Sequence, residues 1–259
     1  MTQPTQPTQP TNRQLAMAHN SDKSKKIKYE TGLIIVMRRF FKKVANDLEK
    51  AYASNQQIID PVIYSEELYN LLRQHYLKVQ KYFSTYVYQT QLSPGQQKLV
   101  KENSQAYEYA LLAQIPSRIK FIINTIKKDI ALLFKNNALE LTPNTFKKLF
   151  LQAAFWRAKL IGITETQNAA ELKKHTQAQY ISVGLGIKLL KVWFTILDGR
   201  ERPWHGAVSL QRTRGDGLFT VAGQFLLHPG DITHGATAAN ICNCRCSALY
   251  FSASPMNKV

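Results

Sequence analysis

The chain has 259 residues, 44% of them hydrophobic, so it can bury a sizeable core and most of it is expected to fold. Its 34 lysines and arginines outnumber 17 acidic residues and give a net charge of +17, which favours polyanionic partners, nucleic acid first among them. The three cysteines all lie between positions 242 and 246, which excludes a disulfide framework and indicates a reducing compartment.

The first 28 residues have few apolar side chains, are interrupted by proline and end in a cluster of lysines. Such a segment cannot bury enough surface to offset the entropy lost on ordering. We therefore predict that residues 1–28 form a disordered basic tail without a secretory signal. The tail either orders against a partner or lies on nucleic acid, or it is only a solvated leader. Its lysines that are expected to face DNA are Lys23, Lys25, Lys26 and Lys28.

Residues 29–162 are predicted to form a helical domain, because apolar side chains recur there at three- and four-residue steps. The polar side of the first helix, at 33–52, carries a second group of cations, which with the tail lysines makes the most positive region of the chain. A phosphate-contacting face and a solvated face are both compatible with this pattern. The helix cations that are expected to face DNA are Arg38, Arg39, Lys42 and Lys43.

The second helix, between Pro61 and Pro94, is rich in tyrosine. Tyrosines mixed with lysine can stack on bases, but at helical spacing they are more typical of a core or a protein interface. The longest apolar run near the start, at 33–37, is far shorter than the ~20 residues of a bilayer span, so no membrane partner is expected. Further helices are expected at 96–114, at 118–138 with Ser117 as cap, and from the N-cap Thr142 to Gly162.

Residues 163–252 are predicted to form a second, small domain, followed by a tail at 253–259. Thr164 and Gln167 have the spacing of a capping box and predict a helix at 165–182. Strands are expected at 187–197, 218–221, 224–227 and 242–251, with a hairpin around Ala222-Gly223. The predicted fold is α+β: a mainly helical N-terminal region, then a small C-terminal domain with a short, mostly antiparallel sheet.

Four short pieces follow one another in the second domain: a charged turn, a glycine-bracketed strand, a Pro-Gly turn and a cysteine-bearing strand. They are Asp198-Gly199-Arg200-Glu201-Arg202-Pro203-Trp204-His205, the strand at 217–223, His228-Pro229-Gly230-Asp231, and Asn240-Ile241-Cys242-Asn243-Cys244-Arg245-Cys246. Their order resembles the C-terminal domain of the Mu F-like minor head (head morphogenesis) proteins of tailed bacteriophages. The resemblance extends over residues 165–251.

The resemblance implies a minor capsid protein, incorporated in few copies near the portal vertex, that acts in head assembly and in DNA packaging or ejection. It implies the portal protein and the double-stranded phage genome as partners, with the major capsid or scaffolding protein as a further one. The implied location is the capsid interior near the portal, and the host cytoplasm during assembly. No enzymatic activity is expected.

The polar residues of the second domain are expected to form a satisfied network that pins its loops. Bonds between an arginine and a carboxylate can fix loops where apolar area is scarce. This interpretation predicts no catalytic residue, no cofactor and no metal. The residues of the predicted network are Glu165, Asp198, Arg200, Arg202, His205, Asn243, Cys244, Arg245 and Cys246.

Two alternatives use residues of the same network. In an enzyme or effector, ADP-ribosyltransferase-like or a hydrolase, Asp198 would orient His205 as general base beside Arg200, which binds an anionic substrate. In a zinc site, His205 would join Cys244 and Cys246, about 6.5 Å apart on one strand face. The short cysteine spacing and the lack of an evident fourth ligand disfavour zinc, and the same spacing would strain a disulfide.

Overall fold

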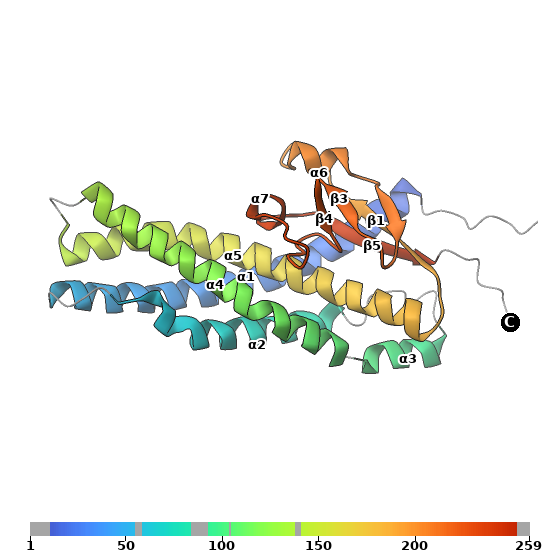
Figure 1. Cartoon of the computed structure of the whole chain (residues 1–259), viewed down its shortest axis with the longest axis horizontal. Coiled ribbons are helices and arrows are strands. Elements are labelled where there is room, and N and C mark those ends of the chain that lie inside the picture. The colour runs from blue at the N-terminus through green and yellow to red at the C-terminus, as the bar shows by residue number, and fades with distance from the viewer. Residues whose placement is uncertain (1–10, 55–58, 84–92, 104, 138–140, 253–259) are drawn as a thin grey trace, which may run out of the picture.

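The computed structural model describes residues 11–54, 59–83, 93–103, 105–137 and 141–252. Within these residues, four long helices run side by side in an elongated array, and two small antiparallel sheets lie against one end of it (Figure 1). The predicted α+β class, with the helices first and the sheets last, is confirmed. The first ten residues and the predicted tail at 253–259 lie outside the described residues.

The helices begin at residues that suit helix starts. Thr11 and Gln14 form a capping box before α1, and Ser93 and Gln96 form one before α3. Thr142 caps α5, as predicted. The helices are α1 Asn12–Ala53, α2 Ser65–Phe83, α3 Pro94–Glu102, α4 Gln105–Asn137 and α5 Pro143–Gln179, with a 3₁₀ turn at Pro61–Tyr64 and a π-helical turn at Tyr180–Gly184.

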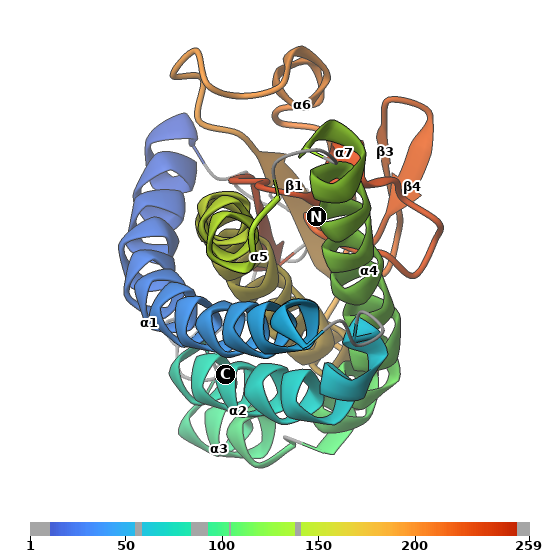
Figure 2. The same cartoon turned by 90° about the vertical axis from the view of Figure 1, so that its left-hand side faces the viewer.

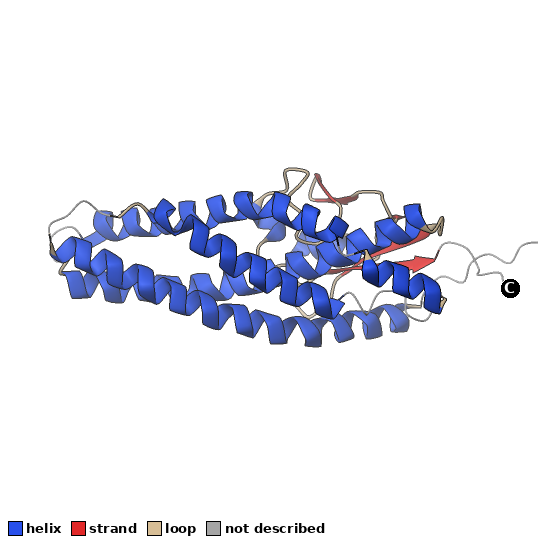
Figure 3. Ribbon diagram, turned by 90° about the horizontal axis from the view of Figure 1, so that it is seen from below, coloured by secondary structure: helices blue, strands red, loops and turns tan. Residues whose placement is uncertain are grey.

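Helix α5 lies at the centre of the array, with α1, α2 and α4 around it (Figure 2). Their apolar stripes meet in one core, which includes Phe41 of α1, Tyr76 of α2, Ile126 of α4 and Phe150 of α5. Seen from below, the helices lie in front, and the strands lie behind them at one end (Figure 3). The part of α5 beneath the strands is therefore buried between helices on one side and sheet on the other.

Residues 12–28, predicted to belong to a disordered tail, form the first part of α1, so the prediction is wrong for them. Leu15 packs against Val192 and Leu249 of the sheet, and Lys26 binds side chains of α5. These contacts with distant parts of the chain supply the burial that the segment lacks on its own.

The predicted domain boundary after residue 162 falls inside α5. Gly162 does not end a helix: a Cβ atom there would lie 2.5 Å from Cγ1 of Ile34, so glycine lets α1 and α5 approach closely. Thr164 does not cap a new helix, because its Oγ1 accepts a hydrogen bond of 3.0 Å from the backbone N–H of Asn243. The helical and sheet-containing regions therefore share one continuous helix.

Helix α4 also differs from the prediction. It begins at Gln105, and both Pro116 and the predicted cap Ser117 lie inside it. Both residues are exposed, so water can satisfy the backbone carbonyl that proline leaves without a donor. The two helices predicted at 96–114 and 118–138 are thus the short α3 and the long α4.

The larger sheet has the order β2-β1-β5, with both outer strands antiparallel to β1. The smaller sheet is the predicted hairpin, and Ala222 (φ 49°) and Gly223 (φ 74°) supply the left-handed pair that a type I′ turn requires. The strands are β1 Leu189–Phe194, β2 Arg212–Arg214, β3 Phe219–Val221, β4 Gln224–Leu226 and β5 Ser247–Ser252, and two short helices, α6 Pro203–Ala207 and α7 Ala238–Ile241, complete the region.

Strand β5 begins at Ser247 and not at Cys242 as predicted. The reason lies at Asn243, whose φ of 52° is incompatible with an extended strand. Within this segment, Cys244 and Cys246 are both buried.

The tyrosines of α2 and the turn before it divide between core and surface. Tyr64 and Tyr76 are buried in the helical core, which confirms the core interpretation for them, whereas Tyr82 is exposed. Tyr86 and Tyr88 lie outside the described residues. Among the described helices, none combines the length and the apolar character that crossing a membrane requires.

Candidate functional site

The turn after β1 joins Asp198 to two arginines. Arg245 approaches the Asp198 carboxylate with two hydrogen bonds of 2.9 Å, and Arg200 donates to the same group. These guanidinium groups, Arg245 first, hold the pKa of Asp198 well below its usual range. The cluster is largely exposed to solvent, so it ties the turn to the segment before β5 at the surface.

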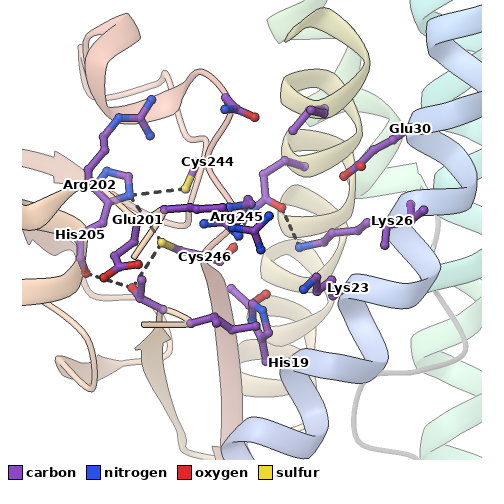
Figure 4. Close-up of a pocket in the computed structure, with 18 residues that line it drawn as sticks. His19, Lys23, Lys26, Glu30, Glu201, Arg202, His205, Cys244, Arg245 and Cys246 are labelled. Atoms are coloured by element: carbon purple, nitrogen blue, oxygen red, sulfur yellow. Dashed lines mark hydrogen bonds between the residues drawn. The ribbon is translucent and has the colours of Figure 1, made fainter. Parts of the chain in front are cut away.

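His205, on α6, lies apart from this turn in a buried cluster with two thiols. Its Nδ1 atom is 3.7 Å from the sulfur of Cys244 and 3.4 Å from that of Cys246 (Figure 4). The side chain of Trp193 packs edge-on against the ring at 5.6 Å. A hydrogen bond between the two thiols lowers the pKa of Cys246 and raises that of Cys244.

The neighbours of His205 also determine its tautomer. The indole N–H of Trp204 can only donate, so the Asn240 atom that it meets at 2.7 Å is the oxygen Oδ1. The same oxygen lies 3.4 Å from Nε2 of His205, which must therefore carry the proton. Nδ1, the other ring nitrogen, faces Cys244 and Cys246.

Glu165 lies elsewhere, in the interior beneath the sheets. It forms a buried ion pair of 3.2 Å with Arg118 of α4 and accepts a hydrogen bond from Tyr76 of α2. Arg118 also donates to the backbone oxygen of Gly230 at 2.9 Å, and so links the helices to the predicted Pro-Gly turn. Asp231 closes that turn by accepting backbone hydrogen bonds.

The predicted single network is therefore wrong: its members lie in separate groups. Asp198, Arg200 and Arg245 form the exposed group, whereas His205, Cys244 and Cys246 form the buried one. Glu165 belongs to the α4 ion pair, Arg202 donates to the backbone oxygen of Cys242, and Asn243 contributes its backbone N–H to Thr164. Glu165 is apart from the other groups because it lies on α5 and faces Arg118 of α4 and Tyr76 of α2.

The hydrogen bond that the enzyme alternative needs, from a ring N–H of His205 to the carboxylate of Asp198, is absent among the described residues. One ring nitrogen of His205 faces the two thiols and the other faces Asn240. Asp198 is instead bound by Arg200 and Arg245.

Sequence reasoning missed a buried ion cluster between α1 and α5. Lys26 lies 2.6 Å from Glu171, and Lys174 binds both Glu171 and Asp22 at 2.7 Å. Burial raises the pKa of Glu171, but Lys174 and Lys26 outweigh it and lower that pKa to about 2. Gln167 accepts a further hydrogen bond from Lys26. Only the tertiary structure reveals this cluster, because its members are far apart in the chain.

A pocket of about 220 Å³ lies between α1 and the sheet region (Figure 4). Lys23 of α1, Glu201 and Arg202 of the loop before α6, and the two buried cysteines line it. The pocket is therefore predominantly basic on its polar side, and it opens directly onto the thiols and His205.

The residues predicted to face DNA divide into surface and interior. Arg38, Arg39, Lys42 and Lys28 are exposed. Lys26 is buried in the ion cluster and cannot face DNA, which corrects the prediction for it. Lys23 and Lys25 are half-buried, and Lys43 is exposed but paired with Glu67 at 2.6 Å.

An exposed tryptophan extends the positive surface of α1 onto α5. Trp156 is 70% exposed, and Lys159 lies over its ring. Arg38 of α1 packs over the neighbouring Phe155, which brings the two helices together at the surface. We call the set Arg38, Arg39, Lys42, Trp156 and Lys159 the α1–α5 basic face. The sequence-based prediction did not include Trp156 and Lys159, because it took the basic residues of the predicted tail and first helix alone.

Searches of protein-family models, of curated proteins and of solved structures find no match to this chain.

Proposed function

We propose that the chain is a minor capsid (head morphogenesis) protein of a tailed bacteriophage. It is incorporated in few copies near the portal vertex, and it acts in head assembly and in DNA packaging or ejection. Its proposed partners are the portal protein and the double-stranded genome, with the major capsid or scaffolding protein as a further one. The proposed locations are the capsid interior and, during assembly, the host cytoplasm.

The proposal is supported by the order of the pieces that resemble the Mu F-like domain, all of which lie in the sheet-containing region. Asp198 in the first piece and Arg245 in the last are 47 residues apart and are joined by two hydrogen bonds of 2.9 Å. The Pro-Gly piece is held to the helical array through Gly230 and Arg118. Contacts between the pieces give each of them a structural role, which suits a scaffold.

The α1–α5 basic face supports the DNA contact in the proposal. Its arginines and lysines are exposed and lie on helices packed against each other, so they can approach phosphates without local unfolding. These cations are spread over two packed helices, and no single helix presents a row of them that could enter a DNA groove and bind base edges. The proposed contact is therefore with phosphates and is independent of base sequence. Such binding suits a protein surrounded by a packaged genome of any sequence.

The experiment is quantitative mass spectrometry of purified phage particles made with the gene intact or deleted. The proposal predicts that the chain is present in intact particles at a copy number far below that of the major capsid protein. It also predicts that deletion lowers the yield of DNA-filled, infectious heads. Absence of the chain from particles of normal infectivity contradicts the proposal.

A further inference from the structure

Three donor atoms converge in the buried cluster of His205, Cys244 and Cys246. At zinc distances of about 2.0–2.1 Å to nitrogen and about 2.3 Å to sulfur, tetrahedral geometry places nitrogen and sulfur ligands about 3.6 Å apart. Nδ1 of His205 lies 3.7 Å from one sulfur and 3.4 Å from the other. All three donor atoms lie within 4.8 Å of one another. A zinc ion therefore fits between them with small side-chain shifts.

The histidine is held in the tautomer that a metal ligand requires. Its Nε2 faces the oxygen of Asn240, which can only accept, and its Nδ1 faces the sulfurs. The side-chain amide of Asn240 is itself fixed, because its nitrogen donates to Gln224 and to the backbone oxygen of Val221. A hydrogen bond on the second ring nitrogen is the usual support of a metal-bound histidine.

The chemistry of the donors selects the ion. Two thiolates and a neutral imidazole are soft to borderline ligands, which favour zinc over magnesium or calcium. Two thiolates also cancel the charge of Zn²⁺, so the occupied site carries no net charge into a buried position. Cys244 and Cys246 are 2% and 3% exposed, so solvent competes weakly for the ion on that side.

The fourth coordination position faces the pocket. The pocket of about 220 Å³ is lined by all three donor residues, so it has room for water or for a small anion at the metal. Arg202 and Lys23 also line it, and their charge favours an anionic fourth ligand. Of the two sequence arguments against zinc, the lack of a fourth protein ligand does not apply to a site that is open to a pocket, and the short cysteine spacing is met by the sulfur-to-nitrogen distances found here.

We propose that His205, Cys244 and Cys246 bind one zinc ion whose fourth position is open to the basic pocket. The ion ties α6, and with it the turn that carries Asp198, to the segment before β5. The bound ion cross-links these two segments, as a disulfide does in proteins of oxidising compartments. It does not depend on the proposed function in a phage head.

The test is metal analysis of the purified full-length chain, expressed with zinc and kept under reducing conditions. One zinc per chain is expected in the wild type, and Cys242→Ser is the matched control that should keep it, because Cys242 lies outside the donor set. Cys244→Ser and Cys246→Ser should lose the metal. Cobalt substitution should give thiolate-to-cobalt charge-transfer absorption and tetrahedral ligand-field bands in the wild type and in Cys242→Ser only.

A second variant guards against simple misfolding of the cysteine variants. Asn240→Leu keeps all three ligands but removes the partner of Nε2, so it should fold by circular dichroism and bind zinc about 10–100-fold more weakly in chelator competition. Wild-type protein that takes up neither zinc nor cobalt overturns the proposal. Metal binding by the double variant C244S/C246S that equals that of the wild type also overturns it. A third contradicting result is a protein mass two hydrogens below the expected mass, which shows a Cys244–Cys246 disulfide in the reduced preparation.

Discussion

Lys26 of α1 and Glu171 of α5 form an ion pair of 2.6 Å in which both side chains are almost completely buried. This pair is part of the reason why the start of α1 is ordered. Glu171 also accepts a hydrogen bond from the backbone N–H of Ala248 at 2.9 Å, so one carboxylate connects the first helix, the central helix and the last strand. The N-terminal segment is therefore a structural part of the sheet region.

The buried pair predicts different outcomes for two lysines that the sequence placed in one DNA-facing group. Lys26→Met should lower the free energy of unfolding by about 3–5 kcal/mol, because it leaves Glu171 short of a charge partner in the interior. Lys28→Met is the matched control: Lys28 is exposed, and its replacement should change stability by less than about 0.5 kcal/mol. Urea unfolding of the two variants measures both changes in the free energy of unfolding. Equal changes would contradict a stabilising role for the buried ion cluster.

Stability should fall as the solution becomes acidic. Burial, with a smaller effect of Lys78, lowers the pKa of His75 from 6.5 to about 3. A histidine kept neutral in the fold stabilises it fully above pH 6.5, and this contribution is lost as the pH falls towards 3, by about 1.4 kcal/mol per pH unit. His75→Gln should therefore show a shallower loss of unfolding free energy between pH 6.5 and 4.5 than the wild type.

A separate acid-induced loss should follow at lower pH. The pKa of Glu171 is about 2 in the fold, below its ordinary value of 4.5, so its stabilising contribution is present above pH 4.5 and is lost towards pH 2. Glu171→Gln should have a lower free energy of unfolding than the wild type above pH 4.5, and this free energy should fall less between pH 4.5 and 2. Parallel pH curves for the variant and the wild type would contradict the assigned role of Glu171.

Asp198 and Glu165 should differ sharply when each is replaced by alanine. Asp198 lies in an exposed cluster, so solvent compensates most of the loss and the melting temperature should fall only slightly. Glu165→Ala leaves the buried charge of Arg118 unpaired and should cost about 3–5 kcal/mol. Thermal unfolding of the two variants tests this order, whereas a single network that contains both residues predicts losses of similar size.

The α1–α5 basic face predicts a salt-dependent contact with duplex DNA. Changing Arg38, Arg39 and Lys42 together to glutamine should reduce the slope of log affinity against log salt by about 2.7, or 0.9 for each lost phosphate contact. The matched control removes three charges that are exposed on α2 and α4, namely Arg73, Lys78 and Lys120. Trp156→Ala should leave the slope unchanged, because it removes no charge. Equal slopes for the wild type and the variant that lacks Arg38, Arg39 and Lys42 would contradict a contact between the α1–α5 basic face and DNA phosphates.

The sequence was sufficient wherever a local pattern determines the structure. The φ > 0 requirement at Ala222-Gly223 indicates the hairpin, and apolar periodicity indicates α2 and the part of α1 at 33–52. It was insufficient where long-range contacts decide. Gly162 resembles a helix stop, but close packing against Ile34 is what requires glycine there. Polar residues around Glu171 lie on every side of α5, so they obscure the burial pattern of this helix.

The candidate site shows the same division. The sequence placed His205, Cys244 and Cys246 together, but it could not separate them from Asp198, since that depends on which way α6 turns after Pro203. The roles of Asn240 and Trp204 follow only from their contacts with the ring. The local run of lysines predicted an exposed position for Lys26, whereas its ion pair with Glu171, which is 145 positions away, holds it in the interior.

The central proposal is tested most directly by an asymmetric cryo-electron-microscopy reconstruction of phage heads that contain this chain. The account predicts density for the long helical array and its attached sheets at the portal vertex alone, in few copies, with the α1–α5 basic face turned towards packaged DNA. Density spread evenly over the shell would contradict it, as would infectious heads that assemble and fill with DNA while the chain remains outside them.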